Sequence, residues 1–84
     1  MEILFHNDAL EDYQYFQEKD AKNFQKINKL IQDITRSPFS GIGKPEPLKH
    51  SLSGFWSRRI NQEHRLVYTI KDNIIYILQC RYHY

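Results

Sequence analysis

The feature that most constrains this chain is a pair of short polar turns in its second half, Asn61-Gln62-Glu63 and Asp72-Asn73. They separate three runs rich in aromatic and aliphatic residues, at 55–60, 65–71 and 74–83. Asp and Asn both tolerate positive φ, so the second turn suits a two-residue hairpin connection. Three apolar runs joined by such turns predict an antiparallel meander of β-strands.

The first half of the chain predicts one short strand and two helices. Residues 2–6 form the strand, and Asp8 with Glu11 resembles a capping box at the start of the first helix. Asp20 is expected to cap a second helix over residues 21–36. The apolar stripe of that helix consists of Phe24, Ile27, Leu30, Ile31 and Ile34. Because the turn between them is so short, the two helices should be antiparallel neighbours.

The connection from the helices to the meander is a loop at residues 37–47, which holds all three prolines and two of the three glycines. Loops on rigid scaffolds often carry functional residues, and this one brings Lys44 and Glu46 towards the meander. Residues 48–52 alternate weakly and are expected to add a fourth strand. With the helices over one sheet face, the sequence predicts a single α+β domain spanning residues 1–84.

Side chains two positions apart share a face of a strand, so the meander can be divided into two faces. The face predicted to form the core beneath the helices consists of Leu66, Tyr68, Ile70, Tyr76, Leu78, Cys80 and Tyr82. The uncovered face is expected to gather Arg59, Arg65, Arg81 and His83. Three guanidinium groups and an imidazole suit a phosphate site. Arg58 falls on the core face, where it needs an edge position or a partner carboxylate.

Composition and charge exclude several classes of protein. A single cysteine excludes an internal disulfide and a cysteine metal cluster. The sequence also contains no HxxxH or CxxC spacing, which disfavours metal catalysis. No signal peptide and no run of roughly 20 apolar residues is seen, so we expect a cytoplasmic protein without a membrane partner.

The charge is distributed unevenly along the chain. Residues 1–43 hold five Lys/Arg and seven Asp/Glu, a charge of −2, whereas residues 44–84 hold seven and three, a charge of +4. A basic half favours an anionic partner, with nucleic acid the first candidate. A solvated cationic surface explains the same charge equally well.

A site that cleaves RNA without a metal needs three groups. A base removes the proton of the ribose 2′-hydroxyl, a cation stabilises charge at phosphorus, and an acid protonates the leaving 5′-oxygen. Glu46, Arg65 and His83 supply one group for each task. The simpler explanations left open are a Glu46 pair with Lys44 or Lys49, an Arg65 pair with Glu63, and a solvated chain end at His83. His50 and His64 are interpreted as structural or surface residues.

Four blocks in the second half carry a family resemblance. They are Lys44-Pro-Glu-Pro-Leu-Lys-His50, Leu52-Ser-Gly-Phe-Trp-Ser-Arg-Arg-Ile60, Glu63-His-Arg-Leu-Val-Tyr68 and Cys80-Arg-Tyr-His-Tyr84. With them the chain resembles, over its whole length, the YoeB/Txe group of bacterial toxins within the RelE/ParE superfamily. The resemblance implies a RelE-like, microbial-ribonuclease-like fold, in which an N-terminal strand and a two-helix hairpin pack on an antiparallel sheet.

The resemblance also implies an activity. Such toxins are ribosome-dependent endoribonucleases that cut mRNA in the A site of the 70S ribosome and inhibit translation, without a metal or cofactor. The expected product is a 2′,3′-cyclic phosphate or its opened 3′-phosphate. Carried over residue by residue, Glu46 is the general base, His83 the general acid and Arg65 the phosphate stabiliser. The residues implied to assist in RNA binding and charge stabilisation are Lys49, Arg59 and Tyr84.

Partners and rivals complete the expectations. The resemblance implies a cognate YefM/Axe-like antitoxin, with operator DNA bound only by the toxin–antitoxin complex that represses their operon. Homodimers are known in the group. One rival function is a non-enzymatic gyrase inhibitor resembling ParE, against which the combination of Glu46 and His83 argues. The other is an RNA-binding module without cleavage, whose binding would weaken with salt.

Overall fold

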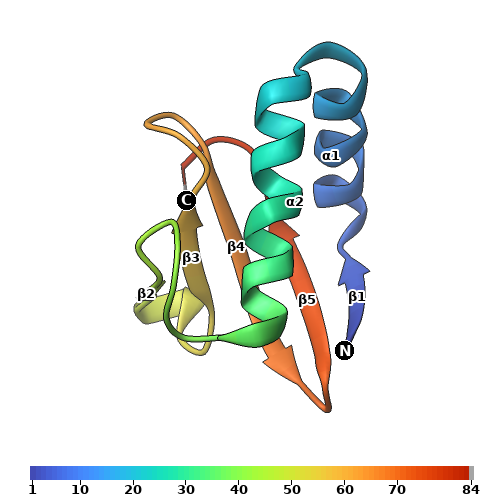
Figure 1. The fold of residues 1–84 in the computed structure, drawn as a ribbon. Coiled ribbons are helices and arrows are strands. Elements are labelled where there is room, and N and C mark those ends of the chain that lie inside the picture. Colours follow the sequence, from blue (N-terminus) through green and yellow to red (C-terminus); the bar gives the residue numbers. More distant parts are fainter. Residues whose placement is uncertain (84) are drawn as a thin grey trace.

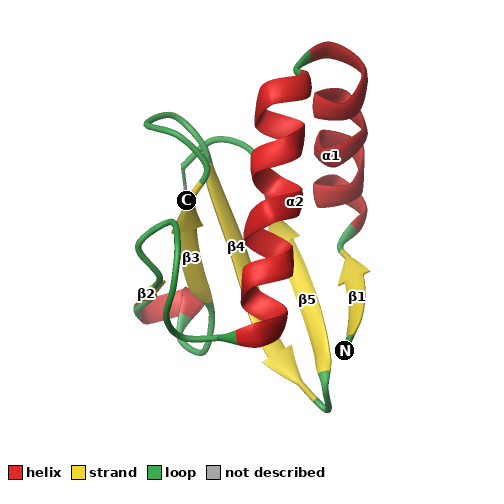
Figure 2. Ribbon diagram, in the orientation of Figure 1, coloured by secondary structure: helices red, strands yellow, loops and turns green. Residues whose placement is uncertain are grey.

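The structure is a computed structural model that describes residues 1–83 of the 84-residue chain. Within that range the chain forms two α-helices, five strands and one 3₁₀ turn (Figure 2). In chain order they are β1 (Glu2–Phe5), α1 (Asn7–Lys19), α2 (Ala21–Arg36), β2 (Glu46–Pro47), the 3₁₀ turn (His50–Leu52), β3 (Trp56–Arg59), β4 (Arg65–Lys71) and β5 (Ile74–Gln79).

The strands form one sheet in the order β1-β5-β4-β3-β2. Strands β2 to β5 are the antiparallel meander, and β1 pairs in parallel with β5 at the opposite edge from β2. The two helices lie side by side across one face of this sheet (Figure 1). The predicted α+β fold is therefore confirmed, with a parallel edge strand added to the expected antiparallel sheet.

The hydrophobic core fills the space between the helices and the sheet. Its largest contributors are Phe16 of α1, four residues of α2, and Leu66, Tyr68, Ile75 and Ile77 of the sheet. The four buried α2 residues belong to the predicted stripe, namely Ile27, Leu30, Ile31 and Ile34. Asp20 caps α2 as expected, since its carboxylate accepts the backbone N–H of Asn23.

The first helix begins differently from the prediction. His6, rather than Asp8, occupies the N-cap, and its Nδ1 accepts the N–H of Asp8 at 3.2 Å. The backbone N–H of His6 donates to Ile77 O of β5 at 2.8 Å. Since the sheet holds His6 at the end of β1, its ring can turn back onto the first helical turn, and the capping box with Glu11 does not form.

The prediction of a strand at residues 48–52 is also wrong. Pairing along β2 stops at Pro47, and the following residues form the 3₁₀ turn. The N–H of Leu48 still donates to Phe55 O at 2.9 Å, but His50 has a φ of 58°, which no extended strand accommodates.

The predicted division of β5 into a core face and an uncovered face is partly wrong. The turn before β5 fixes which residues of β4 and β5 pair, and the prediction did not include this pairing. Asp72 and Asn73 form the expected turn with φ values of 54° and 62°, which pairs Ile70 with Ile75. Ile75 and Ile77 therefore face the core, in place of Tyr76 and Leu78. A bulge between Val67 and Tyr68 then reverses the alternation, so Cys80 is buried as predicted. Strand β5 ends at Gln79, and Tyr82 is exposed.

Candidate active site

The loop that precedes β2 is held from inside the protein by Arg58, which is fully buried. Its Nη1 lies 2.6 Å from Asp33 Oδ2 of α2 and also donates to the carbonyl of Ile42 at 3.1 Å. Its Nη2 donates to the carbonyls of Ser37 and Ser40. The carboxylate partner expected for Arg58 is therefore present, and the same guanidinium fixes three carbonyls of the loop.

Two further groups complete this clamp. The hydroxyl of Tyr68 accepts from Arg58 Nε at 3.2 Å and donates to Pro38 O at 2.7 Å. Burial raises the pKa of Tyr68, which keeps the hydroxyl a donor. The hydrogen bond from Arg58, followed by one from the Ile42 N–H, lowers the pKa of Asp33 below its ordinary value of 3.8. We call these groups, Asp33, Arg58 and Tyr68, the Arg58 clamp.

Strand pairing places Glu46 on the same sheet face as two arginines. Glu46 pairs with Ser57 of β3, and Arg59 pairs with Arg65 of β4. Ser57 and Arg59 are two residues apart, so their side chains share a face, about 6.6 Å apart along the strand. This is the face opposite to Arg58, and it brings one carboxylate and two guanidinium groups to one end of the sheet.

A pocket of about 620 Å³ opens at that end of the sheet. It is lined by four cations, Lys26, Lys44, Arg59 and Arg65, and by Gly43, Ile60, Asn61 and Gln62. The backbone N–H of Arg59 donates to Gly43 O at 2.7 Å, which ties the clamped loop to β3. Lys44 reaches the basic half as expected, whereas Lys26 of α2 was not predicted. A phosphate is the ligand that such a concentration of positive charge favours.

Arg65 is fixed by the β3–β4 turn. Its Nη1 donates to the carbonyls of Asn61 at 2.6 Å and His64 at 3.1 Å. Glu63, the alternative partner considered from the sequence, instead lies 3.1 Å from Nε2 of His64. Within residues 1–83 the Nε and Nη2 atoms of Arg65 make no hydrogen bond, so that edge of the guanidinium can bind a phosphate.

Hydrogen bonds to His64 and Arg65 hold the last described residues beside the β3–β4 turn, although Arg81, Tyr82 and His83 line a separate pocket. The N–H of Tyr82 donates to His64 Nδ1 at 2.7 Å, and Tyr82 O accepts the N–H of Arg65 at 3.0 Å. With Tyr82 held at a φ of 64°, His83 Nε2 lies 3.3 Å from the carbonyl of Gln62. His64 is buried and structural, as interpreted, but the sequence did not reveal that it holds the residue before His83.

The predicted position of Arg81 is wrong. Its Nη1 lies 3.6 Å from Asp12 Oδ1, and its guanidinium stacks over the ring of Tyr15 at 3.9 Å. Both partners belong to α1, on the helical side of the sheet. The prediction extended the alternation of β5 to His83, but β5 ends at Gln79 and the alternation ends with it.

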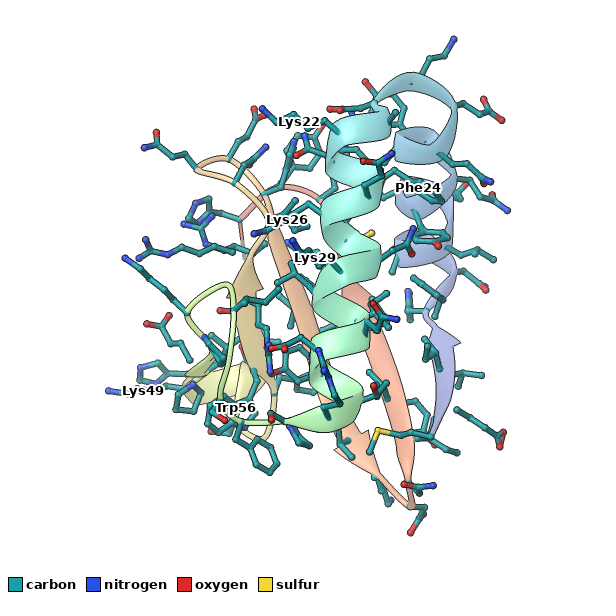
Figure 3. The ribbon with its side chains drawn as sticks, viewed as in Figure 1. Lys22, Phe24, Lys26, Lys29, Lys49 and Trp56 are labelled. Carbon is teal, nitrogen blue, oxygen red and sulfur yellow. The ribbon has the colours of Figure 1, made fainter. Side chains whose placement is uncertain are left out.

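The remaining predicted residues lie apart from the pocket or outside the described chain. Lys49 stands at the start of the 3₁₀ turn, is exposed, and points away from the molecule (Figure 3). Tyr84 lies outside the described residues. The structure thus brings Arg59 and Arg65 together in the pocket. Glu46 lies on the same sheet face as Arg59, and His83 lies beside Gln62, but neither of them lines the pocket.

Across residues 1–83, no group of three or more His, Cys, Asp or Glu side chains is arranged to hold a metal ion. Neither helix in the same range has the length and apolar character needed to cross a membrane.

Comparison with known proteins gives matches over the whole chain. A family model described as YoeB-like toxin of bacterial type II toxin-antitoxin system matches residues 5–84. Toxin YoeB of Escherichia coli (strain K12) is 56% identical over 84 residues, which is 100% of each chain.

Solved structures agree in sequence and in shape. A YoeB/ParE toxin from Agrobacterium tumefaciens superposes with a TM-score of 0.98 at 44% identity, covering 100% of both chains. The toxin in a heterotetrameric YoeB–YefM complex from Staphylococcus aureus has a TM-score of 0.94 at 55% identity, covering 100% of this chain and 98% of that one. A YoeB dimer from the same species matches with the same score, identity and coverage.

Proposed function

This chain belongs to the family of YoeB-like toxins of bacterial type II toxin–antitoxin systems, and we propose that it is an endoribonuclease that cuts mRNA in the ribosomal A site. The observation that supports the proposal is a pocket lined by four cations, Arg59 and Arg65 among them, with Glu46 on the sheet face of Arg59 and His83 next to the β3–β4 turn. This set can perform acid–base cleavage of a phosphodiester without a metal.

Each residue has a role in the proposed reaction. Glu46 accepts the proton of the ribose 2′-hydroxyl, whose oxygen attacks phosphorus to form a 2′,3′-cyclic phosphate. Arg65 and Arg59 stabilise the charge that develops on the phosphoryl oxygens, and His83 donates a proton to the departing 5′-oxygen. Water then opens the cyclic phosphate to a 3′-phosphate. Lys49 and Tyr84 are proposed to assist in RNA binding and charge stabilisation.

The proposal includes partners and a compartment. The Staphylococcus aureus relative forms a complex with YefM and also a dimer. We extend the first observation to this chain as a YefM-like antitoxin that neutralises it and, in complex, represses their operon at operator DNA. We extend the second as a homodimer. Translation takes place in the cytoplasm, so the toxin acts there.

Primer extension on an mRNA in a cell-free translation mixture tests the activity. The wild type should produce new 5′ ends in frame with codons, and Glu46→Ala should produce none. Glu11→Ala removes an exposed carboxylate of α1 and serves as the matched control, which should cleave like the wild type.

Two other outcomes would replace the proposal. Intact mRNA together with altered DNA supercoiling would favour a gyrase inhibitor. Intact mRNA with salt-sensitive RNA binding would favour a binding module without chemistry.

A further inference from the structure

A second hollow adjoins the cationic pocket, between the first half of α2 and the β3–β4 turn. Its volume is about 600 Å³, and its lining includes Lys22, Asn23, Gln25, Lys26, Lys29 and Asn61. Lys26, Ile60 and Asn61 line both hollows, so the two are direct neighbours. We call the second hollow, with its three lysines, the α2 groove.

The lysines of the α2 groove form a row along the helix. Lys22, Lys26 and Lys29 are spaced by four and three residues, which places them on one side of an α-helix over about 10.5 Å. Figure 3 shows all three projecting from the same side of α2, towards the β3–β4 turn. The N-terminal half of the chain is acidic in total, yet it contributes this basic row beside the pocket.

The described part of the chain offers this row of lysines no neutralising partner. None of the three lysines forms an ion pair with a carboxylate of residues 1–83. Asp20 also lines the groove, but its carboxylate accepts the backbone N–H and the side-chain amide of Asn23. The groove therefore presents ammonium and amide donors, which are the groups that contact nucleic-acid phosphates and sugars.

We propose that the α2 groove binds the phosphate backbone of RNA, as an extension of the pocket in which the RNA is cut. The inference rests on the proposed function, because it assigns the groove to the same kind of ligand. Each of the three lysines can neutralise one phosphate of a bound strand and release its counterion. An acidic helix of a protein partner is a less suitable ligand, because a helix that binds in a groove needs apolar anchors. Ile60 is the only apolar residue among those that line the α2 groove.

The RNA has two potential sources, the mRNA that is cut and ribosomal RNA around the A site. Binding is measured for a triple variant, Lys22→Gln/Lys26→Gln/Lys29→Gln, against a 2′-O-methyl RNA oligonucleotide and against vacant 70S ribosomes. Neither ligand requires cleavage, so a failure of the proposed nuclease activity does not affect the result. The plot of log affinity against log salt should become shallower by about 2, since each lost phosphate contact removes about 0.7.

A matched triple variant separates location from net charge. Lys19→Gln/Arg36→Gln/Lys71→Gln removes the same charge from exposed positions outside the groove. It should keep the wild-type salt dependence with both ligands. The ligand for which the groove variant alone loses salt dependence is the source of the bound RNA. The proposal would be overturned if the two triple variants gave equal slopes of log affinity against log salt with both RNA ligands. This would also hold if the groove variant weakened the binding of an acidic protein partner alone.

Discussion

The two sides of the candidate active site are held in place by different means. On the side of the proposed general base, the Arg58 clamp fastens residues 37–42 with a buried guanidinium that reaches α2, the loop and Tyr68. On the side of the proposed general acid, residues 81–83 follow the last strand. Their attachments include hydrogen bonds of Tyr82 to His64 and Arg65, contacts from Gln79, the contact of His83 with Gln62, and the ion pair and stacking of Arg81 on α1.

This difference indicates which changes should affect stability and which should affect chemistry. The clamp is part of the core, so its loss exposes or strands a buried charge and should damage the whole fold. The C-terminal attachment is peripheral, so its loss should release His83 while the core stays intact. The same site would then respond to mutation in two distinct ways.

The largest effect is expected for Arg58→Ala. The substitution removes the charged donor from Asp33 and the donor from three loop carbonyls, and it creates a cavity, so the free energy of unfolding should fall by about 3–5 kcal/mol. Chemical denaturation would measure the change. Arg36→Ala is the control, because Arg36 lies 4.0 Å from the same aspartate with a largely exposed side chain, and its loss should cost less than about 1 kcal/mol. Similar losses for both variants would refute the clamp.

The next effect concerns His64 and is a loss of activity. His64→Phe keeps a ring of similar shape but removes the acceptor for the Tyr82 N–H, so mRNA cleavage should fall roughly tenfold to a hundredfold. His64→Asn places an oxygen near the former Nδ1 and should retain more activity than His64→Phe. Single-turnover cleavage on ribosomes gives the rates, and circular dichroism checks that the fold persists.

A double variant tests whether His64 acts through His83. If it does, adding His64→Phe to His83→Ala should cause little further loss, because the group that it positions is already absent. A loss of the same size in both backgrounds would mean that His64 supports the fold alone.

A smaller effect is expected for the stability of the protein at low pH. Because the folded protein lowers the pKa of Asp33, this carboxylate adds stability above its ordinary pKa of 3.8, and that contribution disappears as the pH falls through the folded value. Asp33→Asn should therefore be less stable than the wild type at pH 7, and the gap should narrow by pH 3. Urea midpoints at the two pH values measure the gap, and a constant gap would contradict the assignment.

The smallest effect concerns Cys80, which directly precedes the attached residues 81–83. Burial is the main cause that raises the pKa of its thiol to about 12, and Sγ lies 3.3 Å from Ala9 O. Alkylation at pH 8 should therefore be slow in the folded wild type and equally slow in His64→Phe. Fast labelling of His64→Phe would show that releasing the chain end also opens β5, which would remove the contrast between the two sides.

Local patterns in the sequence predicted much of the fold. The stripe on α2, the cap at Asp20 and the turn at Asp72-Asn73 depend on neighbouring residues, and all three are confirmed. Which side chains of β5 point to the core depends on the residues that pair across that turn and on a bulge. Counting alternate positions along β5 alone therefore assigned Tyr76 and Leu78 to the wrong face of the sheet. An alternation also has no meaning beyond the last paired residue, which explains the error at Arg81.

The site was only partly predictable for a similar reason. The cations of β3 and β4 follow from strand alternation, and Arg58 was recognisable as a charge on the core face that needed a carboxylate. That Asp33 supplies it depends on how α2 crosses the sheet, which no local pattern contains. Lys26 could have been found, because the spacing of Lys22, Lys26 and Lys29 already places them on one side of the helix.

The pH dependence of single-turnover mRNA cleavage on the ribosome tests the central claim most directly. The wild type should show a rate that falls at both low and high pH, because it needs an ionised base and a protonated acid. Glu46→Gln should lower the rate and remove the fall at low pH, and His83→Ala should lower it and remove the fall at high pH. Profiles that keep both limbs in both variants would show that these residues are not the base and the acid.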